Sequence, residues 1–337
     1  MSTMQNRRHF LTSMSLATAA GLTGVSWSVA RAEPPPETAT VRLPWQFRAF
    51  CEAPKNVAGE LLRAEGFTDV RYIEPPIDAD WNALLASGEL DFSVDFSPGH
   101  ITAIEAGLPV KVLAGLHSGC LELIANDSVR GIADLKGKRV GVFSLTSIPH
   151  VLVTLMAAYV GLDPAKDIQW IMSPDVSAPQ LFNEGKIDAF LGAPPEPQEQ
   201  RALKFGHTIL NTTLDAPWSQ YFCCMLSANA DYVVRYPVAT KRVLRAILKT
   251  ADLCASDPEL VARQLVDGKF TDRYNYALEA LRETRYDRWR EFDPEDTMRF
   301  YALRMQEVGF IKTDPNTIIA DGTDWRFLNE LKRELKT

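Results

Sequence analysis

The tetrapeptide Gly-Glu-Leu-Asp at residues 88–91 follows a short amphipathic segment at residues 80–87, and the arrangement returns 97 residues later at residues 185–188. In each copy the apolar spacing predicts a helix, the glycine ends it, and the aspartate leads into an apolar strand. We therefore expect two similar α/β halves. When such halves face each other, the loops at the carboxyl ends of their parallel strands share a crevice, where open α/β sheets bind ligands. This pattern favours a protein that binds a small molecule.

The N-terminal region has the pattern of an export signal. An Arg-Arg pair at residues 7–8 precedes an uncharged stretch rich in Ala, Ser and Leu at residues 13–30, and Ala-Arg-Ala at residues 30–32 has the small-x-small cleavage pattern. These features predict a twin-arginine signal peptide at residues 1–32 and a mature protein in the periplasm. An ordinary export signal with incidental arginines is the alternative. No later run approaches the ~20 apolar residues that span a membrane.

Net charge argues against two classes of partner. The chain carries a formal charge of −7, and loss of residues 1–32, which contain three arginines and no acid, would make it −10. Such an acidic protein is not expected to bind nucleic acid or an anionic membrane.

The cysteines predict neither a disulfide framework nor a metal centre. Their number is five, which is odd, and no Cys-x-x-Cys occurs. His100, His117 and Cys120 fit no common zinc spacing, so no metal site is expected. Cys223 and Cys224 lie in an apolar strand, where we expect them to act as small core residues.

Alternating strand and helix patterns predict two lobes. Residues 33–125 and 226–337 would form lobe 1, and residues 126–225 would form lobe 2. Crossings near residues 121–130 and 220–230 would supply two hinge strands, about which the lobes could close. The region beyond residue 237 is helical and amphipathic and should pack on lobe 1. The expected fold class is α/β, with the two-lobed architecture of periplasmic binding proteins.

Several segments resemble the nitrate, sulfonate and taurine-type substrate-binding proteins of ABC importers, which share a domain family with thiamine-pyrimidine-synthesis proteins. The segments are residues 88–91, 134–142, 185–189 and 222–225. The resemblance implies a type II periplasmic-binding-protein fold and delivery of a ligand to a membrane permease. Eukaryotic pyrimidine synthases of this superfamily carry a Cys-Cys-Cys-Phe-Cys element, of which this chain has only Cys223 and Cys224. This departure disfavours a synthase.

The expected ligand-binding residues lie at the carboxyl ends of strands or next to the crossings. Ser144, Thr146 and Ser147 precede a helix whose free N–H groups suit an anion or a carbonyl. Glu196 would neutralise a cationic ligand, or would be an ordinary loop acid. Aromatic side chains would stack on a planar ligand, with core packing as the alternative. The full set is Trp45, Gln46, Ser97, His117, Ser144, Thr146, Ser147, Glu196, Trp218 and Tyr221.

The leading hypothesis is a monomeric solute-binding component of an ABC importer. It would capture a sulfonate, nitrate or taurine-like solute and deliver it to the permease transmembrane subunits. One alternative ligand is a pyrimidine or thiamine-precursor heterocycle, and one alternative class is an exported enzyme related to thiamine pyrimidine synthesis. No hydrolase, zinc-protease, P-loop or dinucleotide motif is present, so neither catalysis nor a cofactor is expected.

Overall fold

The computed structural model describes residues 33–45, 49–74 and 80–335. The proposed signal peptide at residues 1–32 lies outside these ranges, as does Gln46, and both stay predictions. From residue 35 onward the chain forms one unit. Among the described helices, none combines the length and the apolar character that a membrane crossing requires.

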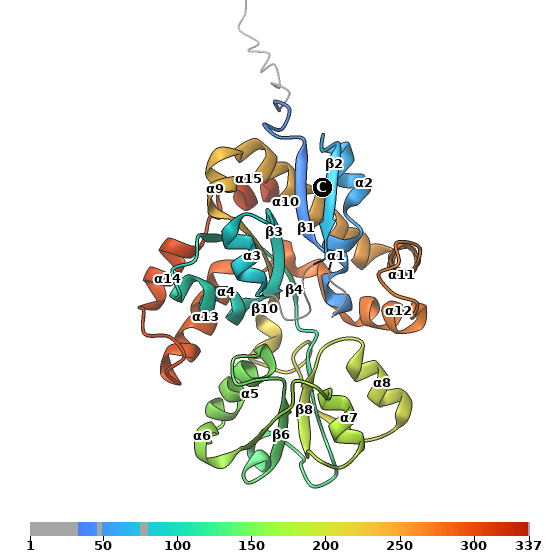
Figure 1. Ribbon diagram of the computed structural model, residues 1–337, viewed down its shortest axis with the longest axis vertical. Helices are drawn as coiled ribbons and strands as arrows, with labels where there is room; N and C mark the ends of the chain where they lie inside the picture. The colour runs from blue at the N-terminus through green and yellow to red at the C-terminus, as the bar shows by residue number, and fades with distance from the viewer. Residues whose placement is uncertain (1–32, 46–48, 75–79, 336–337) are drawn as a thin grey trace, which may run out of the picture. The chain divides into compact units, whose positions relative to one another are not determined.

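The strands form three sheets (Figure 1). The strands are β1 Thr40–Pro44, β2 Asp69–Ile73, β3 Phe92–Phe96, β4 Val110–Ser118, β5 Glu122–Ala125, β6 Arg139–Val142, β7 Gln169–Met172, β8 Ala189–Gly192, β9 His207–Asn211 and β10 Phe222–Asn229. β1 pairs with β2 in parallel. β10 lies antiparallel between β3 and β4 and is buried along its whole length. The third sheet has the order β7-β6-β8-β5-β9 and is parallel from β7 to β8.

Helices connect the strands and make up most of the chain after β10. The α-helices are α1 Ala53–Asn56, α2 Gly59–Ala64, α3 Trp81–Ser87, α4 Ser97–Glu105, α5 Ile148–Tyr159, α6 Pro164–Asp167, α7 Ala178–Asn183, α8 Glu196–Leu203, α9 Ala230–Arg235, α10 Pro237–Ser256, α11 Pro258–Asp267, α12 Tyr274–Glu283, α13 Pro294–Glu307, α14 Pro315–Gly322 and α15 Arg326–Glu334. Short 3-10 turns are η1 Phe50–Glu52, η2 Ile132–Leu135, η3 Trp218–Gln220 and η4 Tyr286–Arg290. α10 and α14 contact β4, and α13 contacts α4, so the C-terminal helices pack around the sheet of β3, β10 and β4 as predicted.

The sequence repeat corresponds to a repeated structural anchor. Asp91, just before β3, accepts hydrogen bonds from the backbone N of Arg42 at 2.7 Å and from its Nη2 through the other oxygen at 2.6 Å. Asp188, just before β8, accepts the same two bonds from Arg139 at 2.9 Å and 2.8 Å. In both halves the carboxylate therefore ties the entry of one strand to an arginine of another strand, Arg42 within β1 or Arg139 at the start of β6. This shared geometry explains why the aspartate recurs.

Both helices of the repeat end at a glycine with a left-handed backbone. φ is +77° at Gly88, directly after α3, and +70° at Gly185, shortly after α7. A left-handed residue ends a helix without strain when it lacks a Cβ atom.

Two crossings between the sheets lie side by side. They begin and end earlier in the chain than the predicted crossings near residues 121–130 and 220–230. Residues 119–121 lead from β4 to β5, and residues 212–221 lead from β9 to β10. The backbone N of Thr212 donates to the carbonyl of Leu121 at 2.9 Å, and the Leu121 N donates to Oγ1 of Thr212 at 2.9 Å. The two crossings are thus hydrogen-bonded to each other.

The lobe boundaries expected after residues 125 and 225 therefore need correction. β5 pairs with β8 and β9, whereas the prediction assigned it to lobe 1. The boundary after residue 225 falls inside β10, which pairs along its length with β3 and β4. An apolar strand pattern does not specify which distant partner the strand joins, which explains the error. We propose the boundaries at the two crossings instead.

Candidate functional site

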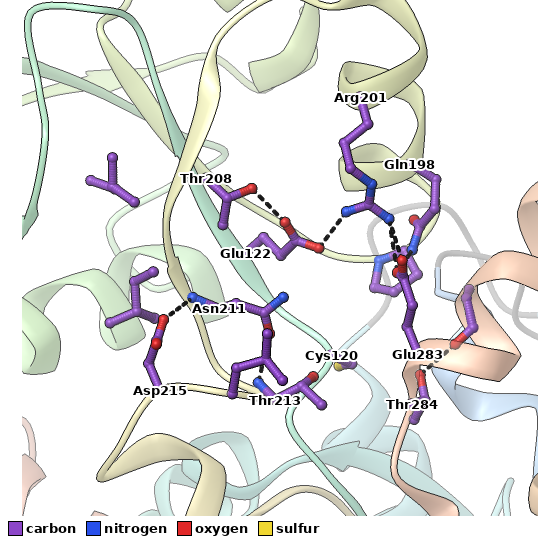
Figure 2. Close-up of a pocket in the computed structure, with 15 residues that line it drawn as sticks. Cys120, Glu122, Gln198, Arg201, Thr208, Asn211, Thr213, Asp215, Glu283 and Thr284 are labelled. Carbon is purple, nitrogen blue, oxygen red and sulfur yellow. Dashed lines mark hydrogen bonds and ion pairs between the residues drawn. The ribbon is translucent and has the colours of Figure 1, made fainter.

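A cavity of about 670 Å³ lies beside the two crossings. Its walls come from β5, α8, β9 and the following turn on one side and from α12 on the other (Figure 2). The lining residues are Cys120, Glu122, Pro194, Gln198, Arg201, Thr208, Ile209, Leu210, Asn211, Thr213, Leu214, Asp215, Ala280, Glu283 and Thr284. The volume is within the range of small-molecule sites.

An ion-pair network crosses this cavity. Arg201 on α8 donates to Glu122 on β5 at 2.6 Å and to Glu283 at the end of α12 at 2.8 Å (Figure 2). Glu122 also accepts a hydrogen bond from Thr208 at 2.6 Å, and Glu283 accepts one from Gln198 at 2.8 Å. Burial tends to lower the pKa of Arg201, but its carboxylate partners raise that pKa above its ordinary value. The guanidinium thus stays charged and links α8 to α12.

The lining carries more negative than positive charge. Among the lining residues, Arg201 is a cation, whereas Glu122, Asp215 and Glu283 are acids. Arg201 already contacts two of these carboxylates, so its charge is compensated by the protein. A neutral or cationic polar ligand suits this cavity better than an anion.

The aromatic residues expected at the site have ring partners within the protein. Trp45 stacks on Phe270 with ring centroids 4.3 Å apart, and Tyr221 stacks on Phe300 at 3.9 Å. Trp218 is 1% exposed and contacts Phe300 edge to face. Neither Trp45, Trp218 nor Tyr221 lines the cavity of Figure 2. For Trp218, the structure shows core packing, which was the alternative to ligand stacking.

The expected hydroxyl groups have hydrogen-bond partners within the protein. The Ser97 hydroxyl donates to the carbonyl of Phe222 at 2.8 Å, and that of Ser147 donates to the carbonyl of Ser144 at 2.6 Å. The hydroxyls of Ser144 and Thr146 lie 3.1 Å apart. These four residues do not line the cavity, so the anion site before α5 stays a prediction.

Glu196 begins α8 and is half-buried, with Oε2 accepting a hydrogen bond from the Ala193 N at 3.1 Å. Desolvation raises the pKa of this carboxyl to about 7, against an ordinary value of 4.5. Because the pKa of this carboxyl is higher in the folded than in the unfolded state, protonation favours the folded state. This contribution to the free energy of unfolding is fully present below the unfolded pKa. That contribution is lost as the pH rises through 7.

The substitution Glu196→Gln should therefore change the pH dependence of stability. We expect the variant and the parent to be equally stable near pH 4, because the carboxyl is then protonated in both states. Near pH 8 the variant should be more stable by roughly 1–2 kcal/mol, after solvent screening of a half-buried group is allowed for. Urea denaturation at several pH values measures the difference. Glu60→Gln, on an exposed part of α2, is the control and should show no such trend.

Four of the five cysteines meet where β4 and β10 adjoin the first crossing. Cys51 in η1, His117 at the end of β4, Cys120 in the crossing and Cys224 in β10 are all buried, and one potential ligand atom from each lies within 4.8 Å of the others. The Sγ atoms of Cys120 and Cys223 are 3.4 Å apart. All five cysteines are free. Sequence reasoning missed this cluster because its members come from three distant parts of the chain, at residues 51, 117–120 and 223–224.

The thiols of this cluster differ in acidity. Burial raises the pKa of Cys224 to about 12. Burial also opposes ionisation of Cys223, but hydrogen bonds from Cys120 and Cys224 favour its thiolate and lower its pKa to about 6. Cys120, by contrast, has a pKa well above its ordinary value, mainly because it is buried.

A buried ion pair follows Cys51 directly in the sequence. Lys55 Nζ lies 3.5 Å from Glu52 Oε2 and donates to the carbonyl of Pro44 at 2.9 Å. Burial raises the pKa of Glu52 to about 8 and lowers that of Lys55, although each partner opposes the shift of the other. The pair thus brings ionisable groups next to the cysteine cluster.

Residues 63–260, more than half of the chain, match the family described as NMT1/THI5 like. The chain belongs to the NMT1/THI5-like family. This membership and the structural neighbours below confirm the resemblance inferred from the sequence.

Curated relatives of this NMT1/THI5-like chain are named for thiamine metabolism. It is 28% identical over 148 residues to a Haemophilus influenzae protein named for thiamine biosynthesis, which covers 42% of this chain and 46% of that protein. It is 23% identical over 249 residues to the Saccharomyces cerevisiae 4-amino-5-hydroxymethyl-2-methylpyrimidine phosphate synthase THI13, with 68% and 71% covered. The chain thus spans about half the length of the first relative.

Solved structures similar to the NMT1/THI5-like chain include periplasmic and ligand-binding proteins. The periplasmic nitrate-binding protein NrtA from Synechocystis superposes with a TM-score of 0.73 at 16% identity, with 90% of each chain covered. The alkanesulfonate-binding protein SsuA from Xanthomonas axonopodis, bound to MOPS, gives 0.69 at 15% identity, with 86% of this chain and 99% of that one covered. These likenesses confirm the predicted periplasmic-binding-protein fold.

Proposed function

We propose that this NMT1/THI5-like protein is the solute-binding component of an ABC importer. It captures a small polar solute in the cavity of Figure 2 and delivers it to a membrane permease. The observation that supports this most is the cavity beside two adjacent crossings, with walls on α8 and α12 that the Arg201–Glu283 ion pair links. A ligand held there would contact elements of both lobes, as closure about hinges requires.

The charge of the cavity favours a nitrogen heterocycle as the solute. An aminopyrimidine offers N–H donors to Glu122, Asp215 or Glu283 and can carry positive charge, whereas a sulfonate or nitrate would face three carboxylates. The names of the curated relatives point to the same class. We therefore favour a thiamine-precursor-type pyrimidine over the anionic solute that led the sequence hypotheses.

The proposed function also includes export to the periplasm. The Arg-Arg pair and the small-x-small pattern within residues 1–32 would send the folded chain through the twin-arginine route to the periplasm. There it would act as a monomer with the transmembrane subunits of its importer. The synthase names of the yeast relatives make an exported enzyme the second candidate.

Calorimetric titration with 4-amino-5-hydroxymethyl-2-methylpyrimidine tests the proposal, with nitrate and taurine as comparison ligands. We expect the pyrimidine to bind, and Glu283→Gln to weaken it roughly 10-fold by removing one carboxylate, about 1.4 kcal/mol. Glutamine can still accept the hydrogen bond from Gln198, so the local structure should persist. The double variant Ser144→Ala, Thr146→Ala is the control and should bind normally, because neither residue lines the cavity.

The products of incubation separate the binder from the enzyme. Mass spectrometry should recover the pyrimidine unaltered after release from the protein. Consumption of the pyrimidine would favour the enzyme instead. Binding of taurine or nitrate that the Ser144→Ala, Thr146→Ala variant loses would restore the anion hypothesis.

A further inference from the structure

We propose that Cys51, His117, Cys120 and Cys224 form a tetrahedral site for a thiophilic, closed-shell metal ion, Zn²⁺ or Cu⁺. The proposal rests on the residues of the cluster and is independent of the solute that the cavity binds. Three thiolates and one imidazole are a donor set that such ions favour.

The spacing of the four side chains suits one ion. Their ligand atoms lie within 4.8 Å of one another. Zinc bonds of about 2.3 Å to sulfur place tetrahedral ligands roughly 3.8 Å apart, so a contraction of about 1 Å at most is needed. Side-chain rotation alone supplies movements of this size. All four residues are buried, so water competes poorly for the ion.

The hydrogen bond of His117 leaves the correct nitrogen available. Its Nδ1 lies 2.9 Å from the carbonyl oxygen of Gly119. A carbonyl can only accept, so Nδ1 carries the proton and Nε2 carries a lone pair. Nε2 is buried and has no hydrogen-bond partner among the described residues. In metal sites, the histidine ligand commonly donates its other ring N–H to a backbone carbonyl, and this bond orients the imidazole toward the ion.

The backbone at Cys120 supports a site that depends on this thiol. φ is +130° at Cys120, a conformation that residues with a side chain rarely adopt. The strain falls on the residue whose Sγ joins the cluster and which also lines the cavity of Figure 2. The proposed metal site therefore adjoins the cavity and includes one ligand from the crossing between the sheets.

A disulfide is the competing use of these thiols. Cys120 and Cys223 have Sγ atoms 3.4 Å apart, so oxidation could join them and remove Cys120 as a ligand. Cys223 is not one of the four proposed ligands. The two accounts therefore predict different states for Cys120 in the isolated protein.

Metal analysis of the full-length chain tests the proposal. The chain is purified anaerobically, reduced, stripped with a chelator, reconstituted with Zn²⁺ or with Cu⁺, and desalted. Elemental mass spectrometry should find one metal ion per chain. Cobalt substituted for zinc should show thiolate-to-metal charge transfer and intense visible bands, which report tetrahedral thiolate ligation without any variant. Competition with chromophoric chelators for each ion identifies which of the two binds more tightly.

Matched variants locate the site. Cys224→Ser and His117→Ala should each weaken zinc binding more than about 100-fold. Removing a residue that only hydrogen-bonds to a ligand costs about 10–100-fold in affinity, and removing the ligand itself should cost more. Cys254→Ser removes a buried cysteine that is not one of the four proposed ligands, and this variant should still bind one ion. Zinc should raise the melting temperature of the parent and of Cys254→Ser but not of Cys224→Ser, with circular dichroism as the check on folding.

Three results of the metal-binding experiments would overturn the proposal. They are less than stoichiometric metal in the reconstituted parent, a cobalt spectrum without thiolate charge transfer, and equal metal binding by the parent and Cys224→Ser. Peptide mapping that finds a Cys120–Cys223 disulfide in the chain as isolated would do the same.

Discussion

The substitution Gly119→Ala is expected to lower the free energy of unfolding by about 2–4 kcal/mol. An added Cβ atom would lie 2.3 Å from the Cα of Thr213 and 2.5 Å from its backbone N. These are backbone atoms, so the conflict is relieved only if the two crossings separate, which strains the hydrogen bonds between Leu121 and Thr212. φ at Gly119 is also +64°, which disfavours alanine. Urea denaturation followed by circular dichroism measures the loss.

Gly137→Ala is the matched control for this prediction. Its φ is +75°, but an added Cβ atom would meet nothing within 4 Å. Alanine there should lose only about 1 kcal/mol, the cost of a left-handed backbone. Equal losses at Gly119 and Gly137 would show that the close approach of the crossings carries no energetic weight.

Local signals explain why the sequence predicted most of the fold. The helix ends at Gly88 and Gly185 depend on residues near them in the chain, and Asp91 and Asp188 each follow three residues later. Each feature could be read within a window of about ten residues. The repeat then indicated two α/β halves, and the structure shows the same anchor in both.

Long-range pairing explains the errors in the lobe boundaries. β5 is an apolar strand only four residues long, and its pattern is compatible with either sheet. Its actual partners, β8 and β9, begin at residues 189 and 207. The sheet to which such a strand belongs is decided by contacts that no local pattern contains.

The candidate site was harder to predict than the fold. Loop hydroxyls such as that of Ser97 were natural choices, but this one donates to the carbonyl of Phe222 from the neighbouring strand. Arg201 and Glu283, which span the cavity, lie on helices where charged residues usually face solvent. Nothing in their local sequence indicates that they meet. The cysteine cluster was missed for the same reason, since Cys51 and Cys224 are brought together only by the fold.

The second large effect is expected at the repeated anchor, where Asp91→Ala and Asp188→Ala should each lower the free energy of unfolding by about 2–4 kcal/mol. Each aspartate accepts charge-assisted hydrogen bonds from the backbone N, Nε and Nη2 of one arginine, Arg42 or Arg139. Alanine removes both acceptor oxygens and leaves the three donors of the arginine without these partners. The urea midpoints of the two variants, measured at pH 7, should be lowered to a similar extent.

The arginine-bound state of Asp188 adds a pH signature to this prediction. Hydrogen bonds from Arg139 lower the pKa of this carboxyl from 3.8 to about 2. A lowered pKa stabilises the fold fully above the unfolded value, and the gain is lost as the pH falls through the folded value. The parent should therefore lose its advantage over Asp188→Ala between about pH 4 and pH 2. Asp69→Ala, which breaks the exposed pair with Arg71, should lower the free energy of unfolding far less, because solvent screens that pair. If Asp91→Ala and Asp188→Ala proved as mild as Asp69→Ala, the repeated carboxylate would be a surface feature. The two α/β halves would then owe their stability to core packing alone.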